Sequence, residues 1–418
     1  MTLASTAQRR IAELASLTPV HRAFHWLHLH QPQIRQWQLD LVRIPAPTFA
    51  ESARAAWFLD RFHQLGLSNV HLDEAGNALA ELEPTAPPDP EIPTRLPRYI
   101  LVSAHLDTVF PPGTPCHPTE TPDSPRIHAP GICDNGAGLS ALLALAAALR
   151  YAAIDLPILF AANVGEEGEG DLRGIRHLFT HPPYRDRIAS AIILEGSGTG
   201  TVVTHALGSL RFRLTVTGPG GHSWADAGTP NPILILSQLL TRLAELPLPT
   251  TPRTTLNIGH ISGGTSINSI PESASALLDL RSTDPAQLTR TESDLREAIA
   301  LFLSAITSQF SSFSPPQLHV QLVGNRPAAS LPHESPLLTT LRAVDRHLNL
   351  RTDPRTASTD ANLPLSLHIP SFAIGTGGVS GGIHTLAEWY DPTGRETALR
   401  RILLTLLDTA RNLAPNAP

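Results

Sequence analysis

Residues 156–170 read LPILFAANVGEEGEG, an apolar run followed at once by two adjacent glutamates, Glu166 and Glu167, between glycines. A short apolar run bounded by turn residues is typical of a buried strand. Two neighbouring carboxylates repel each other, so either a solvated loop or a bound cation must compensate for their charge. The choice between these two explanations decides which chemistry the sequence supports.

The segments on either side of this run alternate between strand and helix patterns. The apolar runs at 99–110 (YILVSAHLDTVF) and 189–198 (ASAIILEGSG) lead into polar residues and are predicted as strands. Residues 138–153 (GLSALLALAAALRYAA) are predicted as a helix. Strands that alternate with helices indicate an α/β fold with a largely parallel sheet flanked by helices.

Another helix is predicted at 48–66. Thr48 and Glu51 have the spacing of a capping box, in which two side chains satisfy the free N–H groups of the first turn. Gly66 is typical of the residue that follows the last turn. We therefore expect a helix that begins at Thr48.

The pattern changes over 204–324. Strands that alternate polar and apolar residues, such as SLRFRLTVTG, are mixed with two amphipathic helices, the first of which Asn231 is predicted to cap. We expect an inserted α+β unit of roughly four strands and two helices. The α/β domain then comprises 1–203 and 325–418.

Composition excludes several classes of function. The chain has 418 residues, a net charge of −6 and 31 basic residues, all of them arginine. The lack of lysine excludes Schiff-base catalysis and a P-loop, and the lack of a basic block speaks against nucleic acid or an anionic membrane surface as partner. Two cysteines are too few for a disulfide framework. With no run of about 18 apolar residues, a cytoplasmic protein is expected.

Acidic residues and histidines follow the ends of several predicted strands. They are His105, Asp107, Asp134, Glu166, Glu167, Glu195 and His384. Because ligands collect at the carboxyl ends of strands in open α/β sheets, we expect these side chains to converge. Histidine and carboxylate without cysteine suit zinc, with manganese or cobalt as alternatives. Four carboxylates match the charge of two divalent ions, which predicts a two-metal site with one bridging carboxylate and a shared water.

Eight short motifs then carry a resemblance to a known family. In chain order they are SAHLDTV, CDNGAG, GEEGEG, LEGSG, GPGGHSW, GGTSINSIP, DLRS and GGIHTLAEW. From about residue 40 onward the chain resembles the co-catalytic zinc exopeptidase and deacylase family. That family includes peptidase T, glutamate carboxypeptidase, acetylornithine deacetylase and succinyl-diaminopimelate desuccinylase, and the likeness is greatest to peptidase T-like members. The resemblance implies a metal-binding catalytic domain at 1–203 and 325–418, with a lid at 204–324 that dimerises.

The resemblance also implies a role for each residue at the strand ends. The ligands would be His105 and Glu195 for one metal, Glu167 and His384 for the other, and Asp134 for both. Asp107 would orient His105 from behind. Glu166 would be the general base that takes a proton from the bridging water and passes it to the leaving amine. Family members often carry an acidic residue, joined by a cis peptide, where this chain has Asn135.

Three residues of the lid match family positions that hold the scissile carbonyl oxygen or a substrate carboxylate. They are His222 in GGHSW, Asn268 in GGTSINSIP and Arg281 in DLRS. Two simpler interpretations stay open, namely Asn268 as a turn residue and Arg281 as a member of a surface ion pair.

The resemblance implies three hypotheses for function. The first is a metallo-exopeptidase that cleaves small peptides with two divalent ions, zinc foremost, as a homodimer. The second is a deacylase of N-acyl amino acids with the same metals and base. The third is a non-catalytic zinc-binding protein, against which Glu166 argues, because metal binding alone does not need that residue.

Overall fold

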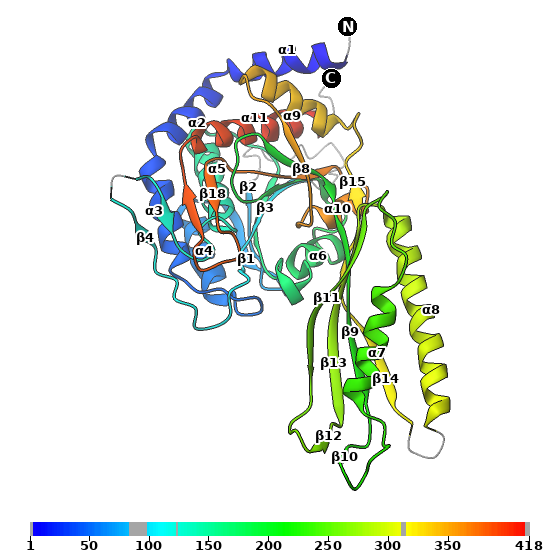
Figure 1. Cartoon of the computed structure of the whole chain (residues 1–418). Helices are drawn as coiled ribbons and strands as arrows, with labels where there is room; N and C mark the ends of the chain where they lie inside the picture. Colours follow the sequence, from blue (N-terminus) through cyan, green and yellow to red (C-terminus); the bar gives the residue numbers. More distant parts are fainter. Residues whose placement is uncertain (1–2, 83–97, 123, 311–314, 414–418) are drawn as a thin grey trace. The chain divides into compact units, whose positions relative to one another are not determined.

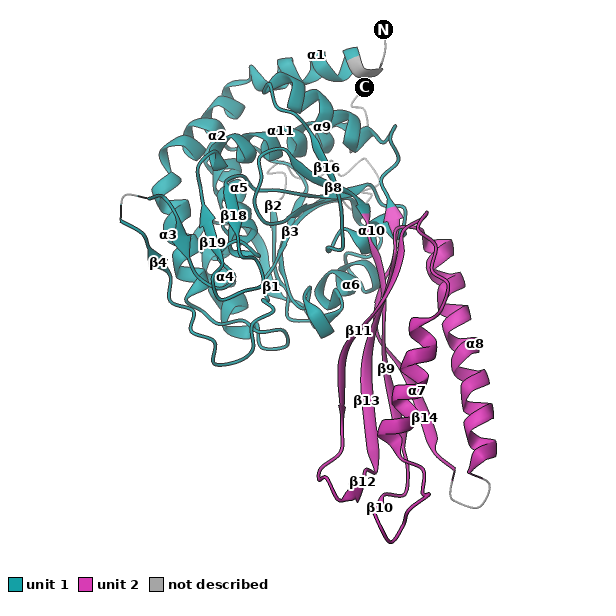
Figure 2. Cartoon of the chain, viewed as in Figure 1, with its two compact units in different colours: residues 1–205, 330–418 teal, residues 206–329 magenta. Residues whose placement is uncertain are grey.

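The computed structural model describes residues 3–82, 98–122, 124–310 and 315–413. The chain forms two compact units, one made of 1–205 with 330–418 (unit 1) and the other of 206–329 (unit 2) (Figure 2). The boundaries expected from the sequence were 204 and 324. We describe each unit by itself.

Unit 1 is built on a nine-stranded mixed sheet. The strand order is β1-β2-β6-β3-β7-β17-β8-β15, and β16 pairs with β8. These strands are β1 (Ser68–Leu72), β2 (Ala78–Leu82), β3 (Tyr99–His105), β6 (Ile158–Asn163), β7 (Ile188–Leu194), β8 (Thr201–Ala206), β15 (Ala329–Ser330), β16 (Asp353–Ala357) and β17 (Ser371–Ile374). The central strands β6, β3, β7 and β17 are parallel, while β1, β2 and β8 pair antiparallel. The predicted sheet with a largely parallel core is confirmed.

Helices cover this sheet (Figure 1). They are α1 (Leu3–Ala15), α2 (Thr18–Leu29), α3 (Gln31–Val42), α4 (Ser52–Gln64), α5 (Gly136–Ala152), α6 (Arg173–Thr180), α9 (Pro336–His347), α10 (Asn362–Ser366) and α11 (Arg395–Leu413). The predicted helix α5 is apolar on all sides because it packs against β3, β6 and β7 as well as against α2, α3 and α11. Within the described part of the chain, no helix combines the length and apolar character needed to cross a bilayer.

A smaller sheet of unit 1 joins two distant segments of the chain. Its order is β18-β19-β5-β4, with β4 (Thr119–Glu120), β5 (Ile127–His128), β18 (Val379–Gly381) and β19 (Trp389–Asp391). β19 pairs antiparallel with β5, with Trp389 opposite His128. The segment after β18 is thereby held beside the loop between β5 and α5.

Unit 2 is an α+β layer of a four-stranded antiparallel sheet and two helices. The sheet has the order β11-β13-β9-β14, with β9 (Gly208–Thr217), β11 (Thr254–Gly263), β13 (Ser273–Ser282) and β14 (Gln317–Arg326). The helices α7 (Pro232–Ala244) and α8 (Pro285–Gln309) pack on one face of it, and a ribbon joins β10 (Gly221–His222) to β12 (Ser269–Ile270). Asn231 caps α7, since its side chain accepts the N–H of Ile233 at 3.0 Å, which confirms that prediction.

The predicted capping box at Thr48 and Glu51 is wrong. Helix α4 begins at Ser52, and Thr48 donates its hydroxyl to Asp107 Oδ2 at 2.9 Å instead. Glu51 accepts the N–H of Phe49 at 3.1 Å, and Phe49 has a left-handed φ of 74°. The two side chains have tertiary and turn partners that the local spacing does not show.

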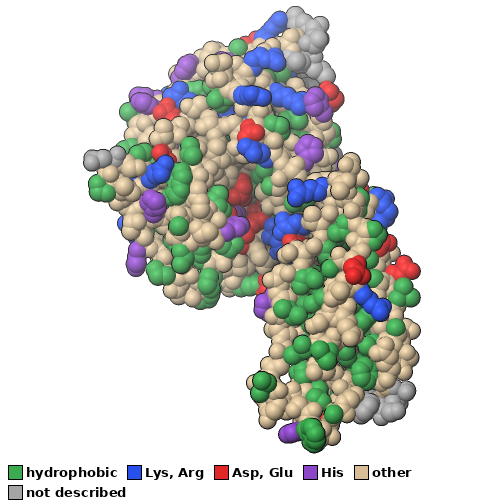
Figure 3. Space-filling model, viewed as in Figure 1, with side chains coloured by type: hydrophobic (Ala, Val, Ile, Leu, Met, Phe, Trp, Pro, Cys, Tyr) green, Lys and Arg blue, Asp and Glu red, His purple; other side chains and the backbone are tan. Residues whose placement is uncertain are grey.

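Charged side chains are spread over the surface. On the face shown in Figure 3, arginines lie among acidic side chains over both units, and the described residues visible there form no single basic patch.

Candidate metal centre

The residues predicted as a metal site all lie at strand ends or in loops of unit 1. His105 ends β3, Glu166 and Glu167 follow β6, Glu195 follows β7, Asp134 precedes α5, and His384 lies between β18 and β19. Because β6, β3 and β7 are parallel neighbours, their carboxyl ends lie at one edge of the sheet. The topology gathers side chains that are far apart in sequence.

Asp134 lies between the two histidines. Its Oδ1 is 3.1 Å from His105 Nε2, and its Oδ2 is 2.9 Å from His384 Nε2. Each histidine also meets a second carboxylate: His105 Nε2 is 3.6 Å from Glu195 Oε2, and His384 Nε2 is 3.3 Å from Glu167 Oε1. Donor atoms of His105, Asp134 and Glu167 all lie within 4.8 Å of one another. The five residues for which the resemblance implies ligand roles thus lie close together, and their roles as ligands stay a prediction.

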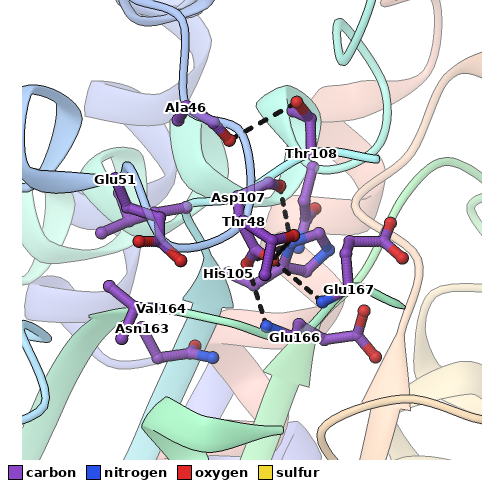
Figure 4. A network of polar contacts seen from close by, with 12 residues as sticks. Ala46, Thr48, Glu51, His105, Asp107, Thr108, Asn163, Val164, Glu166 and Glu167 are labelled. Carbon is purple, nitrogen blue, oxygen red and sulfur yellow. Dashed lines mark hydrogen bonds and ion pairs between the residues drawn. The ribbon is translucent and has the colours of Figure 1, made fainter. Parts of the chain in front are cut away.

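Asp107 contacts both His105 and the backbone of Glu166 and Glu167 (Figure 4). His105 Nδ1 is 3.0 Å from the carbonyl oxygen of Asp107 and 3.6 Å from its Oδ1. A proton on Nδ1 shared with these oxygens leaves Nε2 as the donor atom that faces the other ligands. Asp107 Oδ1 and Oδ2 also accept the backbone N–H groups of Glu166 and Glu167, each at 2.9 Å. Both glutamates are therefore anchored by the same carboxylate that orients His105.

The charges of the site shift the pKa values of its histidines and carboxylates away from their ordinary values. Burial alone would lower the pKa of His105, but Glu195 and the other carboxylates outweigh it and raise that pKa. Hydrogen bonds to Asp134 and Glu167 raise the pKa of His384 to about 10. Burial opposes ionisation of Asp134, yet the two histidines lower its pKa overall. The carboxylates thus attract positive charge strongly, as expected where a cation binds.

The donor set fits a divalent cation. Imidazole nitrogens and carboxylate oxygens are ligands of zinc, cobalt and manganese. Cys133, next to Asp134, is fully buried, and burial raises the pKa of its thiol to about 12. Burial therefore disfavours the ionised form of this thiol. The peptide bond between Asp134 and Asn135 is cis.

Sequence reasoning missed two buried carboxylates beside the site. Glu388 accepts the backbone N–H groups of Gly131, Cys133 and Asp134. Asp360 accepts the side-chain N–H of Asn163, the last residue of β6, at 2.7 Å. Glu388 lies within the quoted motif GGIHTLAEW. Its position in that motif could have marked it as a candidate residue of the site.

The three lid residues lie in unit 2. His222 and Asn268 are adjacent, because Ser223 donates its N–H to the carbonyl oxygen of Asn268 at 3.0 Å beside the β10–β12 ribbon. The Nε of Arg281 donates to Asp279 Oδ2 at 2.6 Å. The simpler interpretation of Arg281 was an ion pair, and Arg281 does form one with Asp279.

Two peptidase family models match parts of the chain. Residues 204–304 match the peptidase dimerisation domain, and residues 77–213 match peptidase family M28. A probable carboxypeptidase from Aspergillus clavatus is 29% identical over 263 residues, which cover 58% of this chain and 56% of that protein. The chain therefore spans about half the length of the curated relatives it matches.

Two solved structures share the fold over nearly the whole chain. A tripeptidase from Staphylococcus aureus has a TM-score of 0.68 at 22% identity and covers 91% of this chain and 98% of its own. The aminopeptidase PepT from Bacillus cereus has a TM-score of 0.68 at 19% identity and covers 92% and 99%. The predicted combination of an α/β fold with a separate dimerisation domain is confirmed.

Proposed function

We propose, since the chain belongs to the zinc exopeptidase and deacylase family, that it is a metal-dependent exopeptidase that cleaves small peptides. The observation that carries this proposal is the position of Asp134 between two histidines, each of which also faces a second carboxylate. Such a set of donors suits two divalent ions joined by one bridging carboxylate.

The proposed ligands divide into two groups around Asp134. His105 and Glu195 would hold one ion and Glu167 and His384 the other, with zinc the first candidate and cobalt or manganese the alternatives. When bound, two such ions supply a polarised substrate carbonyl and a water acidic enough to lose a proton near neutral pH. Asp107 would keep the Nε2 atom of His105 turned toward the site.

Glu166 is the proposed general base. It precedes the ligand Glu167, its backbone N–H is held by Asp107, and its side chain is only 5% exposed. A carboxylate in that position takes a proton from the attacking water and returns it to the leaving amine as the C–N bond breaks. A protein that only bound zinc would not need this residue, so the non-catalytic alternative has less support.

His222 is the proposed donor to the carbonyl oxygen as that oxygen gains negative charge. Its Nδ1 accepts the backbone N–H groups of Trp224 at 3.1 Å and Ala225 at 3.3 Å. A ring nitrogen that accepts hydrogen bonds carries no proton, so the proton of the neutral ring is on Nε2, which is then a donor. In a homodimer formed through the dimerisation domain, this donor would serve the partner chain's site.

Of the two proposed substrate classes, we favour peptides over N-acyl amino acids. The relatives reported above are a carboxypeptidase, a tripeptidase and an aminopeptidase by name. The proposal is tested with a panel of dipeptides, tripeptides and N-acyl amino acids, each assayed with zinc, cobalt and manganese. Faster metal-dependent release of an amino acid from the peptides is expected. Turnover of the N-acyl amino acids alone would favour the deacylase, and no turnover in the metal-loaded protein would contradict both.

A further inference from the structure

Glu388 is a fully buried carboxylate whose partners are all backbone groups of one loop. Its Oε2 accepts the N–H of Gly131 at 2.9 Å, and its Oε1 accepts those of Cys133 at 2.8 Å and Asp134 at 3.0 Å. The residue is 0% exposed. Three donors thus converge on one anion inside unit 1.

The loop needs such an acceptor. It connects β5 to α5, and the N–H groups of Gly131, Cys133 and Asp134 donate to this carboxylate rather than to a carbonyl oxygen of a strand. A buried N–H without an acceptor destabilises the folded chain. Successive N–H groups that point the same way form a natural site for an anion, and Glu388 fills it with two oxygens. Gly131 has a left-handed φ of 72°, a conformation that glycine adopts more readily than other residues.

The same carboxylate belongs to the segment that carries His384. Glu388 donates its own N–H to the carbonyl oxygen of Thr385 at 3.1 Å, which closes a tight turn after His384. Ala129 donates its N–H to the carbonyl oxygen of Glu388 at 3.1 Å. Backbone and side chain of one residue therefore fasten the His384 turn to the Asp134 loop.

These contacts bear directly on the proposed ligands. Asp134 Oδ2 and His384 Nε2 are 2.9 Å apart, although 250 residues separate them in sequence. His384 has a left-handed φ of 64°, an uncommon conformation for a residue other than glycine, so its turn needs outside support. Glu388 supplies that support because it joins the His384 turn to the loop that carries Asp134.

We propose that Glu388 is a positioning residue that sets the separation of Asp134 and His384 and thereby the affinity of the centre for divalent ions. The inference rests on the proposed function only in taking these two residues as ligands. The side chain of Glu388 accepts backbone N–H groups of the Asp134 loop. It acts through the backbone N–H of Asp134 and through the turn that carries His384.

A purely structural role predicts a different result, and the chain offers a matched control. Glu81 in β2 is also a buried glutamate, 3% exposed. It accepts hydrogen bonds from the Tyr99 hydroxyl at 2.5 Å, the Tyr184 hydroxyl at 2.6 Å and the Asn69 amide at 2.8 Å, and none of these residues is a proposed ligand. Replacing either glutamate by glutamine removes a buried acceptor, but only Glu388 is joined to the ligands.

The test compares Glu388→Gln with Glu81→Gln. Zinc affinity is measured by competition with a chelator, and the geometry of the site by the visible spectrum of the cobalt-loaded protein. Glu388→Gln turns an NH2 group toward one of the loop's N–H donors, so zinc affinity should fall about 10–100-fold, the usual effect of a residue that supports a ligand. The cobalt spectrum should change as well. Glu81→Gln should lower the melting temperature and leave affinity and spectrum as in the wild type.

The outcomes separate this inference from the proposed function. Wild-type affinity and an unchanged cobalt spectrum in folded Glu388→Gln would overturn it. A loss of zinc affinity in a protein whose wild type cleaves no peptide would support the positioning role while removing the peptidase assignment. If Glu388→Gln does not fold, Glu388→Asp keeps the charge and shortens the reach, and undiminished zinc affinity in that variant would also overturn the inference.

Discussion

Asp107 Oδ2 accepts the backbone N–H of Glu167 at 2.9 Å, so a residue at the end of one strand holds a proposed ligand at the end of its neighbour. Oδ1 of the same carboxylate accepts the N–H of Glu166. Although burial opposes it, the pKa of Asp107 is lowered, because His105 and these two N–H groups stabilise the ionised form. A single buried charge thus couples the orientation of His105 to the turn that carries the proposed base.

Asp107→Asn tests this coupling. The amide offers one acceptor oxygen and cannot hold both N–H groups and the Thr48 hydroxyl. Zinc affinity should fall about 10–100-fold, measured by chelator competition, and turnover should fall with it. Thr48→Val, which removes only the hydroxyl, is the matched control and should have a smaller effect. Equal affinity in Asp107→Asn and wild type would contradict the role.

Glu166→Gln separates catalysis from metal binding. The amide is close in size to the carboxylate but cannot accept a proton, so turnover should fall at least about 100-fold. Metal content and melting temperature should stay at wild-type values. Glu169→Gln is the control, since Glu169 lies in the same loop and is exposed. Normal turnover in Glu166→Gln would mean that another group is the base.

Asp134→Ala tests the bridging role by metal analysis of the purified protein. Because each oxygen of Asp134 faces a different histidine, its loss should release both ions. His384→Ala removes a ligand from one side only and should release one ion more readily than the other. Full occupancy in Asp134→Ala would show that the carboxylate does not bridge.

His222→Ala tests the proposed donor in the dimerisation domain. Loss of one such donor costs about 3 kcal/mol, so kcat should fall roughly 100-fold or more while metal content is kept. Mixing His222→Ala chains with Glu166→Gln chains should restore part of the activity, because one site of a mixed dimer would hold both wild-type residues. If subunit exchange is demonstrated and no activity returns, His222 does not act on the partner's site.

Tyr184→Phe tests a pH effect away from the metal centre. Burial, the hydrogen bond to Glu81 and the charge of Glu81 raise the pKa of Tyr184. The unfolded tyrosine ionises near pH 10 while the folded one stays protonated, so wild-type stability falls as the pH rises above about 10. At pH 8 the variant should be less stable by about 1.5–3 kcal/mol, and this difference should shrink above pH 10. Urea unfolding at several pH values measures it, with the exposed Tyr151→Phe as the neutral control.

Much of the framework follows from local patterns. The apolar runs that end at His105, Asn163 and Leu194 are strands β3, β6 and β7, and the expected convergence of polar groups at their ends follows from parallel pairing alone. Asn231 caps α7 because a cap is made with residues two or three positions along the chain. Signals of this kind are complete within a short stretch of sequence.

Other features depend on partners far away in sequence. Thr48 and Glu51 had the spacing of a capping box, but Asp107 takes the Thr48 hydroxyl, so the helix begins later. Arg281 forms an ion pair with Asp279, two residues away on the same strand face, while its role as a substrate contact stays a prediction. Local spacing could not rank these competing hydrogen bonds, because their energies depend on which groups are buried together.

By itself, the sequence determined the α/β class, the inserted α+β unit and the residue types of a zinc-like site, because periodicity and ligand chemistry are properties of the side chains. Only the tertiary structure gave the distances of Asp134 from His105 and His384 and showed that Glu388 accepts the N–H groups of the loop that carries Asp134. Glu388 and Gly131 are 257 residues apart and meet through a backbone N–H, which every residue except proline carries. Because the donor is a backbone group, the residue type of Gly131 does not indicate this contact. The contact can be identified only in the folded structure.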